Sequence, residues 1–226
     1  MPEGTAHAVV QILPGWLDTA QRSKLASRLS SEGFIPWMEA DTPRAVFPSA
    51  ETLLKEAEAS RNRIGEQHGR LPVIALGIGF GATMAAASLA RLPGRYIAAG
   101  FWNMPDIKPG KRFLLLSLLR WERFRLGSDV PSRLLRATPG IPPTVGLTIA
   151  ALQLGREISA IPRSLPICIL CSDTSGPNPF EGKGFSNLET ITCGGNQPQH
   201  INDLNQDLSA EFVRWMHKVL ASREER

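Results

Sequence analysis

Short apolar runs alternate with amphipathic segments along the chain, and this alternation constrains the fold more than any other feature. The runs have the length and apolar content of buried strands; they cover 7–13, 35–41, 71–77, 96–103, 165–171 and 188–194. The other segments have helical period; they cover 19–34, 49–69, 82–92 and 207–222. Strands that alternate with helices form parallel βαβ units with right-handed crossovers. The sequence therefore predicts an α/β three-layer sandwich with a mostly parallel sheet.

Residues 105–163 interrupt this rhythm. Helical periodicity covers 110–127 and 144–161, and prolines mark the ends and connections of these segments. A chain of 226 residues can bury the core of one domain but is short for two. We expect a single domain over 1–226, with 105–163 as a helical cap insert.

Charge and cysteine content limit the classes of partner. The formal net charge is only +4, and the basic residues concentrate in one segment without a basic-aromatic surface motif, so nucleic acid is not an expected partner. The chain has no membrane-spanning run and no signal-peptide pattern, so a reduced, cytoplasmic setting is expected. Cys168 and Cys171 would face opposite sides of a strand, and we expect no metal centre and no cofactor.

The segment 71–90 has the pattern of a nucleophile elbow, in which a serine occupies a sharp strand-to-helix turn between small residues. Gly77 and Gly81 supply the small residues, and Gly79 holds the position of the nucleophile. Glycine has no side chain that could form an acyl-enzyme, so covalent catalysis from this position is excluded. A dinucleotide-binding glycine turn is the weaker interpretation, because the glycine spacing is short and this strand is the third.

The order of elements, the elbow and the insert together resemble the α/β-hydrolase superfamily over nearly the whole chain. The resemblance implies an oxyanion-like site at Gly15 and Trp16, completed by the backbone N–H of Phe80. It also implies that Asp173 is the acid, with Thr174 as the alternative if the alignment moves by one residue. His200 then matches the family's histidine.

Within this superfamily, the segments 19–34 and 99–124 are similar to the proteins called exosortase A system-associated hydrolase type 2. That resemblance implies a bacterial exopolysaccharide or protein-sorting context. It also implies an elbow without serine.

The basic insert has two interpretations. It is either a cap that packs its apolar face on the sheet and leaves its arginines in water, or a surface for an apolar, phosphate-bearing or membrane ligand. In the second case Trp102, Arg112, Arg120 and Trp121 would contact the ligand, through aromatic rings and guanidinium groups.

Three functions remain open at this point. The first is a non-hydrolytic protein that binds a small molecule, a lipid-like ligand, a membrane surface or a protein partner. Its binding site would be the mouth of the former active site, beside the glycine turn at Gly79. The second is a hydrolase, lyase or isomerase that uses His200, with Asp173 or a neighbour, as acid or base without a covalent intermediate. The third is a structural subunit whose mouth is filled by its own side chains.

Overall fold

The computed structural model describes residues 6–13, 19–38, 50–78, 80–102, 156–172, 180–193 and 206–224. Within them, parallel strands form one sheet in the order β2-β1-β3-β4-β5-β6. The strands are β1 (Ala8–Leu13), β2 (Phe34–Trp37), β3 (Val73–Ile78), β4 (Ala98–Trp102), β5 (Ile167–Ser172) and β6 (Leu188–Cys193). The helices are α1 (Thr19–Ser31), α2 (Ala50–His68), α3 (Phe80–Arg91), the 3-10 helix η1 (Arg156–Ala160) and α7 (Gln206–Glu224).

The expected α/β three-layer class is confirmed, and all described strand pairs are parallel. Gly33 follows the end of α1 as expected, and its φ of +81° is one that residues other than glycine rarely adopt. Several boundaries differ by a few residues from those expected, and the run expected over 35–41 corresponds to the short β2, from Phe34 to Trp37. The insert is described only from residue 156 onward, where η1 (Arg156–Ala160) is a 3-10 helix; the rest of the helix expected over 144–161 lies outside the described residues.

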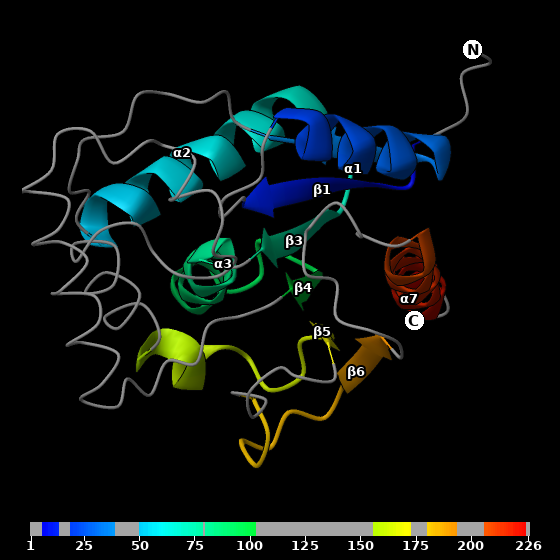
Figure 1. Cartoon of the computed structure of the whole chain (residues 1–226). Helices are drawn as coiled ribbons and strands as arrows, with labels where there is room; N and C mark the ends of the chain where they lie inside the picture. Colours follow the sequence, from blue (N-terminus) through cyan, green and yellow to red (C-terminus); the bar gives the residue numbers. More distant parts are fainter. Residues whose placement is uncertain are drawn as a thin grey trace, which may run out of the picture.

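Alternate residues of each strand point to opposite faces of the sheet, and helices cover and bury both faces. One face packs against α1 and α7, through residues that include Val10, Leu76 and Leu170. The other packs against α2, α3 and η1, through residues that include Val9 and Ala75. Figure 1 shows α7 on one side of the strands and α2 and α3 on the other.

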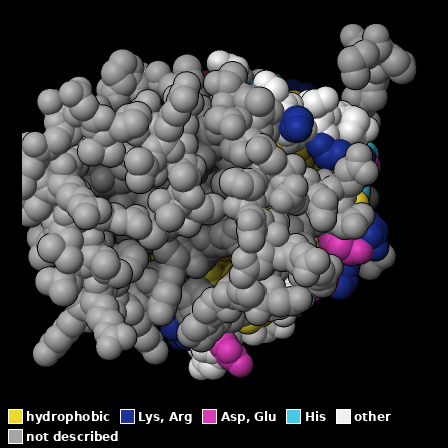
Figure 2. All heavy atoms as spheres, viewed as in Figure 1, with side chains coloured by type: hydrophobic (Ala, Val, Ile, Leu, Met, Phe, Trp, Pro, Cys, Tyr) yellow, Lys and Arg dark blue, Asp and Glu magenta, His cyan; other side chains and the backbone are white. Residues whose placement is uncertain are grey.

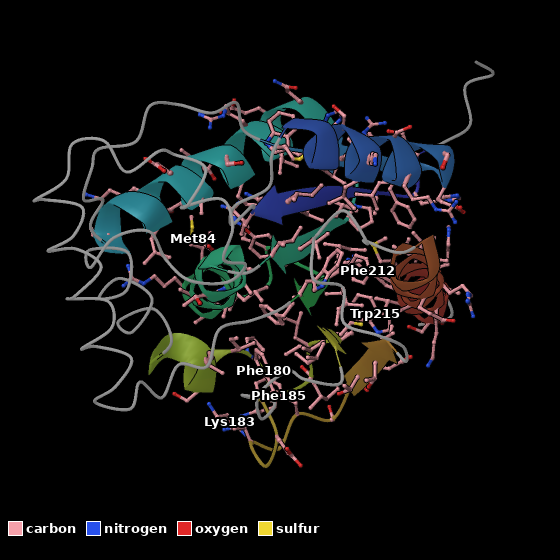
Figure 3. All side chains as sticks on the ribbon, viewed as in Figure 1. Met84, Phe180, Lys183, Phe185, Phe212 and Trp215 are labelled. Carbon is pink, nitrogen blue, oxygen red and sulfur yellow. The ribbon has the colours of Figure 1, made fainter. Side chains whose placement is uncertain are left out.

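The contact between α7 and the sheet depends on a glycine in β4. A Cβ atom at Gly100 would lie 2.6 Å from Cζ of Phe212, so only glycine leaves room for this ring. The rings of Phe212 and Trp215 stack with centroids 5.5 Å apart, and both side chains lie between α7 and the strands (Figure 3). The close approach of the Phe212 ring to Gly100 therefore allows α7 to pack directly against the sheet.

On the opposite face, aromatic packing holds the segment before β6. The rings of Phe101 and Phe180 stack at 4.9 Å, and Phe180 also contacts the edge of Phe185. Figure 3 shows Phe180 and Phe185 close together below α3. Within the described residues, no helix has both the length and the apolar character needed to cross a membrane.

Candidate functional site

The junction of β3 and α3 is a sharp strand-to-helix turn. β3 ends at Ile78 and α3 begins at Phe80. A Cβ atom at Gly77 would overlap the Cα of Ala82 and would lie 2.7 Å from the carbonyl oxygen of Gly81. The end of the strand therefore passes directly against the backbone of the first helical turn, which requires a small residue at 77.

The expected order of this segment is confirmed, since the third strand leads into a helix that carries Thr83 and Ala86. Gly79 itself lies outside the described residues. The backbone of Phe80 starts α3, so its N–H is among the first four of the helix, which have no acceptor within the helix. These N–H groups and the helix dipole favour negative charge at this end.

Most other candidate residues lie outside the described part of the chain. They are Gly15, Trp16, Arg112, Arg120, Trp121, Asp173, Thr174 and His200. The described elements still fix where they occur along the chain. Asp173 follows Ser172, the last residue of β5, and His200 falls in the connection between β6 and α7.

Trp102 is the one candidate ligand contact that the structure describes with its side chain. It is the last residue of β4, pairs with Ile78 in the parallel register and is only 7% exposed. It borders a small, mostly apolar cavity of about 10 Å³, which has space for about one water molecule at most. The cavity is lined by Leu25, Arg28, Leu29, Leu76, Trp102, Leu170 and Phe212. In the described residues Trp102 therefore packs into the layer between the sheet, α1 and α7.

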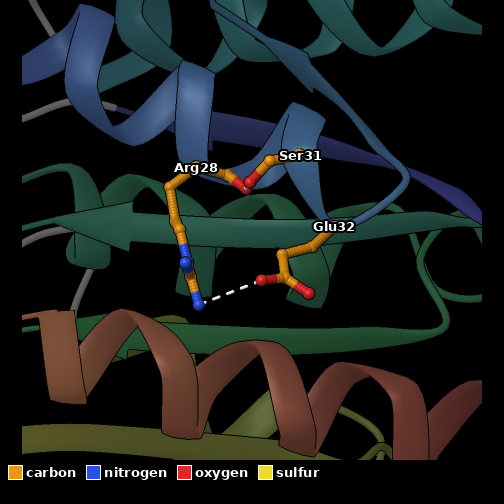
Figure 4. Close-up of polar contacts among 3 residues, drawn as sticks. All are labelled: Arg28, Ser31 and Glu32. Atoms are coloured by element: carbon orange, nitrogen blue, oxygen red, sulfur yellow. Dashed lines mark hydrogen bonds and ion pairs between the residues drawn. The ribbon is translucent and has the colours of Figure 1, made fainter.

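An ion pair lies at the rim of this cavity. Nη2 of Arg28 is 2.9 Å from Oε1 of Glu32, one turn further along the chain (Figure 4). The hydroxyl of Ser31 donates to the carbonyl oxygen of Arg28 at 2.8 Å. Both charged side chains are partly exposed, so the pair contributes at most about 1 kcal/mol to stability.

Among the residues that the structure describes, two hydroxyl groups in α3 are buried without a hydrogen-bond partner. They belong to Thr83, which is fully buried, and Ser88, which is 2% exposed. Thr83 lies four residues after Gly79. An unpaired buried hydroxyl costs about 1–3 kcal/mol relative to a paired one, so α3 carries polar groups that the core does not satisfy.

A buried polar network lies between β1, β2, α2 and the start of β4. The side chain of Gln11 donates to Oγ of Ser60 at 3.1 Å and to the carbonyl oxygen of Ala57 at 3.3 Å. Its Oε1 accepts from the hydroxyl of Tyr96 at 2.9 Å, and Nε1 of Trp37 donates to Ser60 at 3.1 Å. Sequence reasoning did not identify this network, although a glutamine inside the apolar run 7–13 was a visible signal.

Burial shifts two titratable groups beside this network. It raises the pKa of the Tyr96 hydroxyl, which the cation of Arg61 partly opposes, and it lowers the pKa of Arg61. The guanidinium of Arg61 lies over the Tyr96 ring at 5.6 Å and donates twice to the carbonyl oxygen of Arg95. Tyr96 precedes the amino end of β4, so this network belongs to the core and not to the carboxyl edge of the sheet.

In the described ranges no three His, Cys, Asp or Glu side chains gather closely enough to hold a metal ion. Cys168 is buried in the layer between the sheet and α7, as expected of a small core residue. The side chain of Cys171 is not described.

Solved structures of several enzymes share this architecture across nearly the whole chain. A thermostable carboxyl esterase from Bacillus coagulans superposes with a TM-score of 0.69 at 13% identity, covering 97% of this chain and 92% of the esterase. A protein described as a non-heme bromoperoxidase from Mycobacterium tuberculosis gives a TM-score of 0.69 at 12% identity, covering 96% and 94%. The chain has the α/β-hydrolase fold. A monoacylglycerol lipase from Paleococcus ferrophilus gives a TM-score of 0.63 at 13% identity, covering 96% and 95%.

Because these sequence identities are low, the superpositions show the fold and say nothing about which reaction, if any, the protein catalyses. No protein-family model matches the chain, and no curated protein matches it in sequence. In an α/β-hydrolase fold the reacting groups follow the carboxyl ends of the strands. The turn after β3 lies at this edge of the sheet and is therefore the expected position of a functional site.

Proposed function

We propose that this protein is an α/β-hydrolase-fold protein without a serine nucleophile, and that it binds a ligand at the carboxyl edge of the sheet without acyl-enzyme chemistry. One observation carries the proposal. β3 ends at Ile78, α3 begins at Phe80, and the backbones of Gly77 and Ala82 are in direct contact. Gly79 is the one residue in sequence between strand and helix, where the elbow has its nucleophile, and glycine offers no attacking atom.

The ligand class follows from the groups expected around this turn. Backbone N–H groups of Phe80 and of Gly15 or Trp16 would receive an anionic or carbonyl oxygen. Trp121 would line an apolar part of the site, and the arginines at 112 and 120 would pair with phosphate or carboxylate. Trp102 is expected to contribute little to it, because its side chain is only 7% exposed and packs in the core layer with α1 and α7. A small or lipid-like molecule with an anionic group fits this set, and the cap insert 105–163 would cover it. A protein partner at the same mouth is the other binding mode.

The cellular setting remains a proposal as well. The resemblance of segments 19–34 and 99–124 to exosortase-associated hydrolases supports an accessory role in bacterial exopolysaccharide or protein-sorting systems. We propose a cytoplasmic protein with a single domain over 1–226 that does not bind nucleic acid.

Fluorophosphonate probes and short p-nitrophenyl esters test the absence of covalent catalysis. We expect the protein to remain unlabelled and to consume no ester above background. A folded serine esterase of the same fold serves as the positive control. Stoichiometric labelling of a serine such as Ser88 or Ser172 would overturn the proposal; Ser88 is only 2% exposed, so its labelling would require α3 to open.

A non-covalent enzyme is the alternative, because two proton-transfer groups follow neighbouring strands of the sheet. Asp173 comes directly after β5, and His200 follows β6, its neighbour in the sheet. A histidine held by a carboxylate can act as acid or base without a nucleophile. His200→Ala separates the two functions: loss of a measured turnover in a folded variant supports the enzyme, whereas unchanged ligand binding supports the binding protein.

A further inference from the structure

Two histidines from opposite ends of the chain lie side by side. His7 precedes β1 and is exposed, whereas His217 lies on α7 and is half-buried. Their ring centroids are 5.3 Å apart, with the ring planes at 79°. Figure 1 shows the start of β1 and α7 close together on the same side of the molecule.

The surrounding packing holds both rings in place. The ring of Phe34 lies 4.9 Å from that of His217 and 6.2 Å from that of His7. The backbone N–H of His7 donates to the carbonyl oxygen of Gly33 at 2.9 Å. A Cβ atom at Gly33 would lie 2.7 Å from Cδ2 of His7, so this glycine provides the space for the imidazole.

Neither imidazole has a hydrogen bond or an ion pair within the part of the chain that the structure describes. The basic residues next to His217 along α7 are engaged: Arg214 pairs with Glu211, and Lys218 pairs with Glu189 at 3.0 Å. Figure 2 shows acidic and basic side chains beside each other on the side of the molecule where α7 lies. The Cδ2–Nε2 edge of the His7 ring faces Gly33, which leaves Nδ1 of His7 as the nitrogen that can turn to a shared ion. The paired carboxylates offset the nearby positive charge.

The separation of the two rings matches chelation of one ion. With a metal–nitrogen bond of about 2.1 Å and about 1.1 Å from nitrogen to ring centre, each centroid lies about 3.2 Å from the metal. At a tetrahedral angle, two such rings have centroids about 5.2 Å apart, close to the 5.3 Å observed here. We propose that His7 and His217 form a bidentate site for a divalent transition metal such as Zn²⁺, which joins the first strand to the last helix.

Two neutral imidazoles would supply the protein ligands, and water would complete the coordination, since no third ligand gathers there among the described residues. Such a site binds only the folded chain, because the unfolded chain does not hold its two ends together. Zinc therefore stabilises the native state according to its concentration. The site is independent of the ligand site proposed after β3.

Calorimetric titration with ZnCl₂ and thermal unfolding, both on tag-free full-length protein, test this site. We expect saturable zinc binding and a zinc-dependent rise of Tm at pH 7.5. His7→Phe and His217→Phe keep an aromatic ring against Phe34 but remove the ligand nitrogens. Each should weaken zinc binding at least about tenfold, the lower end of what even an outer partner contributes.

His68→Phe is the matched control, because this ring contacts Trp37 at 5.9 Å on another part of the molecule. It should leave the zinc titration unchanged. The double variant His7→Phe with His217→Phe retains His68 and His200, so an undiminished zinc response in this variant would overturn the proposal. A wild-type titration without saturable binding would overturn it equally.

Discussion

The backbone of Gly77, near the end of β3, lies directly against the backbone of Ala82 in the first turn of α3. Any Cβ atom at position 77 would meet main-chain atoms, among them the carbonyl oxygen of Gly81 at 2.7 Å. Main-chain atoms cannot turn aside as a flexible side chain can. The sharp turn between β3 and α3 is thus fixed by contact between two stretches of backbone.

Gly77→Ala should therefore lower the free energy of unfolding by about 1–3 kcal/mol, because the helix start must move to admit a methyl group. Urea denaturation monitored by circular dichroism measures this. Gly65→Ala is the matched control: it lies within α2, its nearest contact would be the Arg61 side chain at 3.7 Å, and it should stabilise the fold by up to about 1 kcal/mol. Equal stabilities of the two variants would contradict the close contact at Gly77.

Restoring a serine at the elbow should not restore an esterase. Gly79→Ser supplies an attacking oxygen, but a triad also needs its base and its orienting acid within hydrogen-bond reach. We expect hydrolysis of p-nitrophenyl acetate to stay near background in this variant. Efficient turnover that disappears on adding His200→Ala would show that a working base is already in place, and would favour the enzyme over the binding protein.

Tyr96 should make the fold sensitive to alkaline pH. Burial raises the pKa of its hydroxyl, so the folded state holds this proton more tightly than the unfolded chain does. The corresponding stabilisation is complete below the unfolded pKa of about 10 and is lost as the pH rises above it. Tyr96 is the only tyrosine, so tyrosinate absorbance reports its ionisation alone.

The control for this prediction is Tyr96→Phe. It removes the hydrogen bond to Gln11 and costs about 1 kcal/mol at neutral pH. Above pH 10 it should lose less stability with each further pH step than the wild type does. Parallel pH profiles for the two proteins would mean that Tyr96 ionises as it does in the unfolded chain.

Gly100 and Phe212 should be energetically coupled. Gly100→Ala places a methyl group 2.6 Å from Cζ of the Phe212 ring and should destabilise by about 1–3 kcal/mol. Phe212→Leu removes the ring atoms that the methyl group meets, so the two changes together should cost less than their sum. A double-mutant cycle by chemical denaturation measures this coupling. Strict additivity would show that α7 does not depend on the glycine.

The arginines of the insert should control association with anionic surfaces. Arg112→Glu with Arg120→Glu should weaken binding to vesicles that contain anionic lipid, and the difference should shrink as salt rises. Lys24→Glu with Arg70→Glu makes the same change in net charge at exposed positions elsewhere. If both pairs reduce vesicle binding equally, the effect belongs to net charge and the insert is an ordinary solvated cap.

Much of the fold was determined by the sequence alone, because hydrophobic period and helix-ending residues act between neighbours in the chain. The alternation of apolar runs with amphipathic segments predicts the strands and helices, and Gly33 ends α1 where expected. The glycine at position 79 is likewise a fact of the sequence, and the chemistry that it excludes needs no coordinates.

Only the tertiary structure decided which distant residues meet. Gln11 bonds to Ser60, 49 residues away, and to Tyr96, 85 residues away. His7 and His217 come together from opposite ends of the chain. Period and composition describe which way a side chain faces on its own element, but not which partner it finds across the packed layers. These contacts exist because strand order, register and close approach at glycines bring the elements together, and no local pattern encodes that arrangement.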